Sequence, residues 1–202
     1  MGERGDRLEA ALARIDDANG EDPTVVEHDG ARVAKELLYA RRMSARLAAL
    51  APDASEALQL AVRAQHIQRW KIPRASRPEG TTGYKQWRSE LARMHAELTG
   101  RILRDVGYGD DVVARVGALV QKRGLGRDAE AQTLEDVACL VFLEHYFTEF
   151  ASEHAPDKVI DIVRKTWRKM SERARREALA LAPGLPTPAR ALLERALGSE
   201  ET

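Results

Sequence analysis

The stretch TLEDVACLVFLEHYF, residues 133–147, decides the fold class of this chain. The segment VACLVFL at its centre is apolar throughout, and neither glycine nor proline interrupts the stretch. A helix that is apolar on all sides lies in the interior of a protein. We therefore expect a buried helix from Ala129 to Phe150, in a protein that is built from helices packed together.

The rest of the chain also has the composition of a helical protein. Alanine, leucine, arginine and glutamate dominate it, and the alternation of apolar and polar residues that marks strands is absent. One long helix is predicted between Pro23 and Leu50, and another from Thr82 to Val106. Residues 73–83, PRASRPEGTTG, form the longest predicted loop, and loops of this length are often functional.

These patterns predict an all-α bundle of about seven to nine helices. At 202 residues the chain is long enough to bury one hydrophobic core. We expect a single helical domain over residues 1–202. An N-terminal helix (1–22) and a C-terminal tail (183–202) are expected to be its appendages.

The balance of charge bears on the class of partner. The chain has 32 Lys+Arg and 32 Asp+Glu residues, whereas proteins that bind nucleic acid or membrane surfaces are usually basic. No apolar run approaches the roughly 18 residues of a membrane span, and the N-terminus lacks the apolar region of a secretory signal. The single cysteine, Cys139, excludes an internal disulfide. We expect a cytoplasmic protein whose partner is neither nucleic acid nor membrane.

Two histidines are predicted to face the interior. His66 continues an apolar series at four-residue spacing, and His95 occupies the same kind of position on the next long helix. The two series are Leu58, Val62, His66, Trp70 and Trp87, Leu91, His95, Leu98. These residues are either core histidines, each satisfied by a backbone carbonyl or a neighbouring acid, or the ligands of a site.

Two acids on the buried helix are candidates to complete such a site. Asp136 shares a face with Leu140, and a carboxylate in that position needs a metal, an arginine or a histidine to offset its desolvation. Imidazole and carboxylate from separate helices are usual ligands of Mn, Fe, Zn or Mg. We expect His66, His95 and Asp136 to hold a divalent metal, with Glu135 as catalytic base or partner of a ligand. The alternative is that both acids only complement the helix dipole.

The order His66, His95, Asp136 resembles that of the histidine–aspartate (HD) phosphohydrolase superfamily. This resemblance implies an HD-like helical fold, a divalent metal and the hydrolysis of a phosphorylated substrate. The chain departs from the HD pattern at one place, because Ala96 follows the second histidine where that superfamily has aspartate.

A second resemblance covers roughly residues 30 to 175. The chain resembles an uncharacterised family, domain of unknown function 4202, which implies no activity. The segments that carry the resemblance are QHIQRWKIPR, GYKQWR, HAE, LEDVACLVFLEHYF and KTWRKMS.

Cations and tryptophans surround the two histidines along the chain. Arg69 follows His66 closely, and Arg88 lies two helical turns before His95. Arginine binds phosphate or carboxylate in a bidentate manner and stacks on flat rings. The predicted residues for an anionic substrate with a flat ring are Arg69, Trp70, Arg74, Trp87 and Arg88. The alternative is that long basic side chains merely lie along aromatic surfaces.

Three functions follow from these patterns. The first is a metal-dependent hydrolase of a phosphorylated small molecule such as a nucleotide, in which the metal activates water. The second is a non-catalytic module that binds an anion or nucleotide, and the third is a helical iron-dependent oxidoreductase. The chain has no phosphate loop ending in GK[ST], no GxSxG and no HExxH motif.

Overall fold

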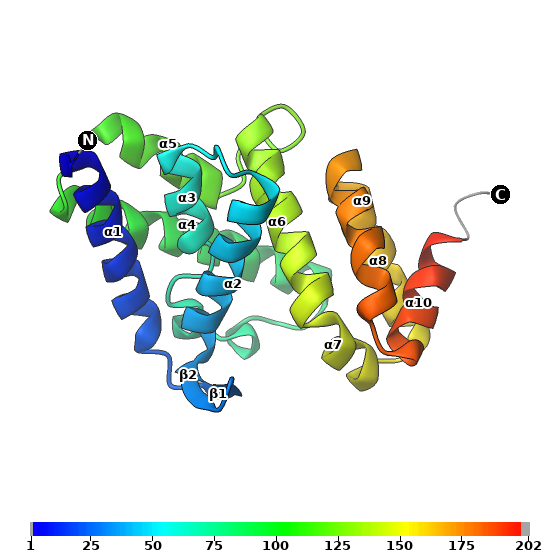
Figure 1. The fold of residues 1–202 in the computed structure, drawn as a ribbon. Helices are drawn as coiled ribbons and strands as arrows, with labels where there is room; N and C mark the ends of the chain where they lie inside the picture. The colour runs from blue at the N-terminus through cyan, green and yellow to red at the C-terminus, as the bar shows by residue number, and fades with distance from the viewer. Residues whose placement is uncertain (1, 199–202) are drawn as a thin grey trace. The chain divides into compact units, whose positions relative to one another are not determined.

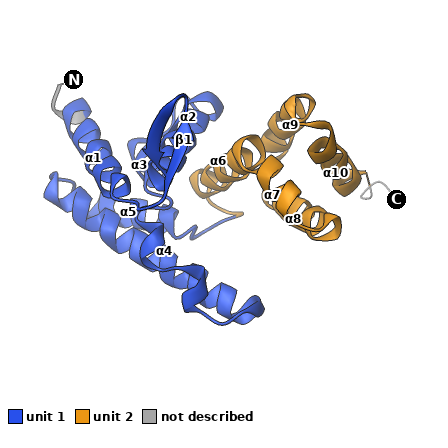
Figure 2. Cartoon of the chain, turned by 90° about the horizontal axis from the view of Figure 1, so that it is seen from below, with its two compact units in different colours: residues 1–125 blue, residues 126–202 orange. Residues whose placement is uncertain are grey.

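The computed structural model describes residues 2–198 of the chain (Figure 1). Helices make up most of these residues, and the prediction of an all-α fold is confirmed. The chain groups into two compact units, residues 1–125 and residues 126–202 (Figure 2). None of the described helices combines the length and the apolar composition that a membrane crossing requires.

The first unit contains five α-helices and a small hairpin among its described residues. Two short 3₁₀ turns, η1 and η2, lie between α3 and α4. The elements are α1 Gly2–Gly20, β1 Val25–His28, β2 Ala31–Ala34, α2 Lys35–Leu50, α3 Glu56–Arg63, η1 Arg69–Lys71, η2 Arg74–Ser76, α4 Gly80–Asp105 and α5 Asp110–Val120.

The second unit contains the remaining five α-helices of the described chain. Its elements are α6 Ala129–His145, α7 Phe147–Glu153, α8 Pro156–Lys169, α9 Glu172–Leu181, η3 Ala182–Gly184 and α10 Thr187–Leu197. The total of ten exceeds the predicted seven to nine, partly because the helix predicted from Ala129 to Phe150 is interrupted at Tyr146.

Both predicted appendages contain residues of the folded core. Helix α1 contacts α2, α3 and α4, and its Ala11 and Ile15 are fully buried. Helix α10 contacts α7 and α8 and buries Leu193 and Ala196. The apolar faces of both helices are therefore covered within their own units.

A β-hairpin replaces the first part of the helix predicted between Pro23 and Leu50. Strands β1 and β2 pair antiparallel, and the two residues between them, Asp29 and Gly30, have positive φ angles of 50° and 75°. An Asp-Gly pair in this conformation matches the right-handed twist of the strands that it joins. The prediction of helix was therefore wrong here, and α2 begins only at Lys35.

The start of α2 is held by a carboxylate from the preceding loop. Asp22 accepts hydrogen bonds from the backbone N–H groups of Thr24, at 2.9 Å, and Glu36, at 3.0 Å. A carboxylate beside the first turn satisfies a free N–H group and complements the helix dipole. This contact fixes the backbone of Glu36, whose side chain belongs to the candidate site.

Helix α3 ends at Arg63, earlier than the sequence predicts. Gln68 has a φ angle of 51°, and its N–H donates to Oδ1 of Asn19, at the end of α1, at 3.0 Å. The prediction that one helix carries both His66 and Trp70 was therefore wrong. A contact across 49 residues turns the chain, and His66 lies in the turn.

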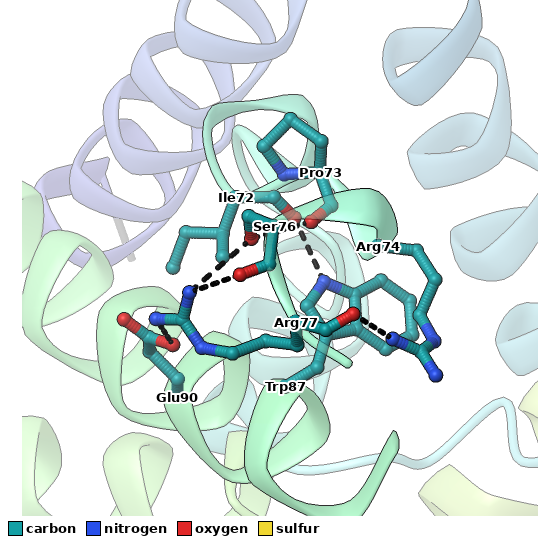
Figure 3. Close-up of polar contacts among 7 residues, drawn as sticks. All are labelled: Ile72, Pro73, Arg74, Ser76, Arg77, Trp87 and Glu90. Atoms are coloured by element: carbon teal, nitrogen blue, oxygen red, sulfur yellow. Dashed lines mark hydrogen bonds and ion pairs between the residues drawn. The ribbon is translucent and has the colours of Figure 1, made fainter. Parts of the chain in front are cut away.

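The predicted loop 73–83 is fixed against α4 (Figure 3). The indole Nε1 of Trp87 donates to the carbonyl oxygen of Ile72 at 2.8 Å, and Arg77 forms an ion pair with Glu90. Arg74 donates to the carbonyl oxygens of Arg77 and Pro78. Helix α4 already begins at Gly80, so only a short part of this segment is irregular.

Candidate functional site

Two histidines meet inside the first unit, where α2, the turn after α3, and α4 come together. His66 lies in the turn and His95 on α4, with their ring centres 6.3 Å apart. His95 is 3% exposed, and the side chain of His66 keeps 22% of its exposure. The sequence predicted both side chains to face the interior, and the structure brings them together.

The ring of His66 is held on three sides. Its Nε2 lies 2.8 Å from Nη1 of Arg69, and its Nδ1 lies 3.5 Å from Oε2 of Glu36. The ring of Tyr39 stacks on it at 4.1 Å with an interplanar angle of 12°. A guanidinium has only donors, so Nε2 accepts and Nδ1 carries the hydrogen toward Glu36.

His95 has one nitrogen engaged and one available. Its Nδ1 lies 2.7 Å from the carbonyl oxygen of Ile67. A carbonyl oxygen only accepts, so Nδ1 carries the hydrogen and Nε2 keeps its lone pair. Within the described chain Nε2 has no hydrogen-bond partner. His95 therefore presents an acceptor nitrogen at a cavity.

Burial makes both imidazoles neutral at physiological pH. Desolvation lowers the pKa of His66 well below its ordinary value, and three cations lower it further. Desolvation, followed by the neighbouring His66, lowers the pKa of His95 to about 3. Burial raises the pKa of Glu36, while the charges of Arg69 and Lys35 oppose that rise. The cations that act on His66 are Arg69, Arg88 and Lys122.

A cavity of about 510 Å³ opens beside the two histidines. The charged side chains that line it are all cationic, and no carboxylate from the described residues is among them. The lining residues with polar side chains are Gln65, His66, Arg69, Arg88, Ser89, Arg93, His95, Gln121, Lys122 and Arg123. The cavity is therefore suited to an anion.

Arg69 is held in place at this cavity by aromatic stacking. Its guanidinium carbon lies 4.9 Å from the ring centre of Trp87, which is itself buried and anchored to Ile72. Burial lowers the pKa of Arg69, and Glu36 opposes this effect. Trp87, predicted to contact substrate, does not line the cavity but supports a residue that does.

The other predicted substrate residues separate into two groups. Arg69 and Arg88 line the cavity. Trp70 is half-buried in η1 and does not line the cavity. Arg74 does not line it either, and donates hydrogen bonds to the backbone carbonyl oxygens of Arg77 and Pro78. Residues 73–78 thus contribute mainly structure, while η1, α4 and the turn after α5 contribute the cations of the site.

The predicted acids lie in the second unit, where each has a local partner. Asp136 accepts hydrogen bonds from the side chain of Gln132 and from the N–H and hydroxyl groups of Ser171, which caps α9. Oε1 of Glu135 lies 3.7 Å from Nζ of Lys169. The roles predicted for Glu135 and Asp136 stay predictions.

The donor set beside the histidines does not fit a divalent cation. His66 uses one nitrogen for Arg69 and directs the other toward Glu36, so only Nε2 of His95 is available there. A single neutral ligand among several cationic side chains cannot offset the desolvation of a metal ion. Among the residues that the structure describes, no three His, Cys, Asp or Glu side chains are grouped to hold a metal.

Sequence reasoning missed several residues of the site. These residues reach it from elements other than the predicted loop, and only Glu36 and Tyr39 had a local signal, since their spacing puts them on one helix face. The missed residues are Glu36, Tyr39, Gln65, Arg93, Lys122 and Arg123.

The comparisons with known proteins give one match. Residues 9–193 match the family described as Domain of unknown function (DUF4202). Neither a curated protein nor a solved structure matches the chain. The resemblance to the HD superfamily has no support from these comparisons. Because the match covers most of the chain, the protein belongs to the DUF4202 family.

Proposed function

We propose that the first unit binds a small phosphorylated molecule in the cavity beside His66 and His95. The observation that carries this proposal is the lining, whose charged side chains are cationic without exception among the described residues. Hydrogen bonds between guanidinium groups and phosphate are charge-assisted and geometrically specific. The cations of the lining are Arg69, Arg88, Arg93, Lys122 and Arg123.

The neutral histidines and a buried amide add selectivity. Nε2 of His95 can accept a hydrogen bond from a ligand hydroxyl. Cationic side chains carry only donors and could not accept such a bond. Gln65 also lines the cavity, is 6% exposed, and has a buried Oε1 without a hydrogen-bond partner among the described residues. Buried polar groups are normally satisfied, so an unpaired one beside a cavity supports a ligand that carries donors.

Calorimetric titration with inorganic phosphate, sugar phosphates and nucleotides tests this proposal. We expect binding of at least one class of phosphorylated compound, and Arg88→Gln is expected to weaken it about tenfold, because one charge-assisted hydrogen bond is lost. Arg101→Gln is the matched control, since Arg101 is an exposed residue of the same helix outside the cavity. No binding across the whole panel would refute the proposal.

A second candidate function is hydrolysis of the bound phosphate ester. The favouring observation is the acceptor Nε2 of His95 at the cavity, next to a histidine oriented by Glu36. Nε2 of His95 would accept a hydrogen bond from the attacking water and orient it. Water would form the new P–O bond, and the ester oxygen would leave with the electron pair of the broken bond and take up the proton that the water loses. Transfer of a phosphoryl group is catalysed largely by positioned cations, which this lining supplies.

Measuring phosphate release with and without chelator distinguishes hydrolysis without a metal from metal-dependent hydrolysis. We expect untagged protein to release phosphate from a bound ester equally well with and without chelator, because the donor set beside the histidines does not fit a metal. Loss of release in chelator, together with stoichiometric metal in the purified protein, would instead support the predicted site of His66, His95 and Asp136. Binding without any release would leave the non-catalytic binding module.

A further inference from the structure

The side-chain acceptors that line the cavity differ in whether the protein itself satisfies them. Nε2 of His66 accepts from Arg69 at 2.8 Å, and Oε1 of Gln121 accepts from Nη2 of Arg123 at 3.0 Å. The hydroxyl group of Ser89 belongs to an exposed residue, which solvent reaches. Two buried acceptors of the lining remain without a partner among the described residues: Oε1 of Gln65 and Nε2 of His95.

Both of these acceptors belong to one corner of the first unit. Gln65 lies in the turn 64–68, and the carbonyl oxygen of Ile67 in the same turn accepts from Nδ1 of His95 at 2.7 Å. Oε1 of Gln65 is buried although no group of the described chain donates to it. The turn therefore fixes one acceptor through its backbone and supplies the other through a side chain.

Three of the five cations of the lining lie nearer to solvent than these acceptors. Arg88, Arg93 and Arg123 are exposed, whereas Gln65 and His95 are 6% and 3% exposed. A phosphate ion held by the exposed arginines leaves both buried acceptors unpaired, which is unfavourable. The cavity, at about 510 Å³, is large enough for a small organic molecule. A ligand that satisfies the whole lining therefore has a part beyond its phosphate that reaches the acceptors.

The chemistry of the lining narrows what this second part is. It must donate hydrogen bonds to Gln65 and His95, and the cations of the lining would repel a positive charge on it. No phenylalanine, tyrosine or tryptophan is among the described lining residues, so the cavity lacks the large ring surfaces on which nucleobases stack. Leu91, Ala92 and Val120 offer apolar surface to C–H groups. Hydroxyl groups on a carbon skeleton meet these conditions.

We infer that the ligand is a phosphorylated polyol such as a sugar phosphate, and that Gln65 and His95 select it by accepting hydrogen bonds from its hydroxyl groups. The phosphate lies among the cations, and the hydroxyl groups lie beside the turn 64–68. A hydroxyl group at Nε2 of His95 occupies the nitrogen that would orient water in hydrolysis. The inference therefore rests on the proposed binding function and not on the hydrolysis candidate, and it narrows the ligand to one chemical class.

Calorimetric titration of the wild-type protein with a matched pair of probes tests the class of ligand. A hexose phosphate and cyclohexyl phosphate carry the same phosphate group on a ring of similar size, but only the hexose has further hydroxyl groups. We expect the hexose phosphate to bind more tightly, by on the order of tenfold for each hydroxyl group that meets an acceptor. Cyclohexyl phosphate leaves the acceptors unpaired, and such sites reject a ligand that lacks the matching donor.

The variant Gln65→Met tests the role of the amide. Methionine is of similar size but is only a weak acceptor, so the advantage of the hexose phosphate should fall by on the order of tenfold. Affinity for cyclohexyl phosphate should change little. Because Oε1 of Gln65 has no partner in the described chain, the variant should melt at or above the wild-type temperature.

Gln59→Met is the matched control for this variant. Nε2 of Gln59 donates to the carbonyl oxygen of Ala54 at 2.9 Å, and Gln59 does not line the cavity. The control therefore loses a hydrogen bond of the fold and no contact with the ligand. Its melting temperature should fall, whereas its affinity for both esters should match that of the wild type.

The outcomes separate this inference from the function on which it rests. If phosphate esters bind but the hexose phosphate is no tighter than cyclohexyl phosphate, the inference is overturned and the proposed function stands. Tighter binding of a nucleoside monophosphate than of the hexose phosphate overturns it too, as does an advantage that survives in Gln65→Met. Equal loss of affinity for both esters, with a lower melting temperature of Gln65→Met, would show that the amide only supports the fold. If neither ester nor inorganic phosphate binds, the proposed function itself fails.

Discussion

Lowering the pH from 7.5 to 4 is expected to remove on the order of 3 kcal/mol of folding stability through His95 alone. Its pKa falls from an ordinary 6.5 to about 3 in the folded protein, mainly through burial. The unfolded chain therefore binds a proton at His95 between these two pH values, and the folded chain does not. Stability contributed by the neutral ring is complete above pH 6.5 and is lost progressively as the pH falls toward 3.

The variant His95→Asn isolates this effect. Its side-chain amide keeps a donor for the carbonyl oxygen of Ile67 but cannot titrate. Urea unfolding of both proteins at pH 7.5 and pH 4 gives the difference in pH dependence between them. His66, whose pKa is also lowered, adds a further loss of folding stability as the pH falls. Glu36, whose pKa is raised, adds a gain of folding stability as the pH falls. Both groups are present in both proteins, so an equal pH dependence of the two would contradict a buried neutral His95.

Replacing Arg69 by glutamine is expected to weaken phosphate binding by about 100-fold, which corresponds to about 2.7 kcal/mol. Two losses combine in this variant. The guanidinium that is held between His66 and Trp87 no longer meets the anion. The guanidinium also offsets the negative charge of the Glu36 carboxylate, so without it that charge acts on phosphate without compensation.

Two companion variants separate the two losses in calorimetric titrations with phosphate. Arg69→Lys keeps the charge but not the planar fork or the stacking on Trp87, so its affinity should lie between those of the wild type and Arg69→Gln. The double variant Arg69→Gln/Glu36→Gln removes the repelling carboxylate and should recover part of the lost affinity. Wild-type affinity in Arg69→Gln would show that phosphate binds elsewhere.

Local signals predicted the fold class because they depend on neighbouring residues only. The apolar segment of α6 buries Leu134, Val137 and Leu140 completely. The hairpin at Asp29-Gly30 has an equally local signal, which the helical composition around it outweighed in the prediction. The end of α3 has no such signal, because Asn19 turns the backbone at Gln68 from a distant part of the chain.

In the candidate site, too, patterns of neighbouring residues predicted one part of the arrangement, and distant segments decided the rest. Helical spacing and the neighbouring arginines predicted that His66, His95, Arg69 and Arg88 lie together, and all four line one cavity. The remaining cations come from other positions on α4 and from the turn after α5, so no pattern within the predicted loop points to them. These cations are the basis of the proposal that the histidine pair lies beside an anion site.

The sequence by itself determined that the chain is helical, which segments are apolar enough to be buried, and that His95 turns inward, because periodicity is a property of neighbouring residues. His66 lies in a turn that a contact with distant Asn19 fixes, so helical periodicity does not account for its position. The tertiary structure alone decided which charges surround those histidines and how Asp136 is satisfied, by Ser171. A buried polar group is stabilised by whatever donor or charge reaches it in space. That partner comes from a distant segment, so local spacing cannot specify it.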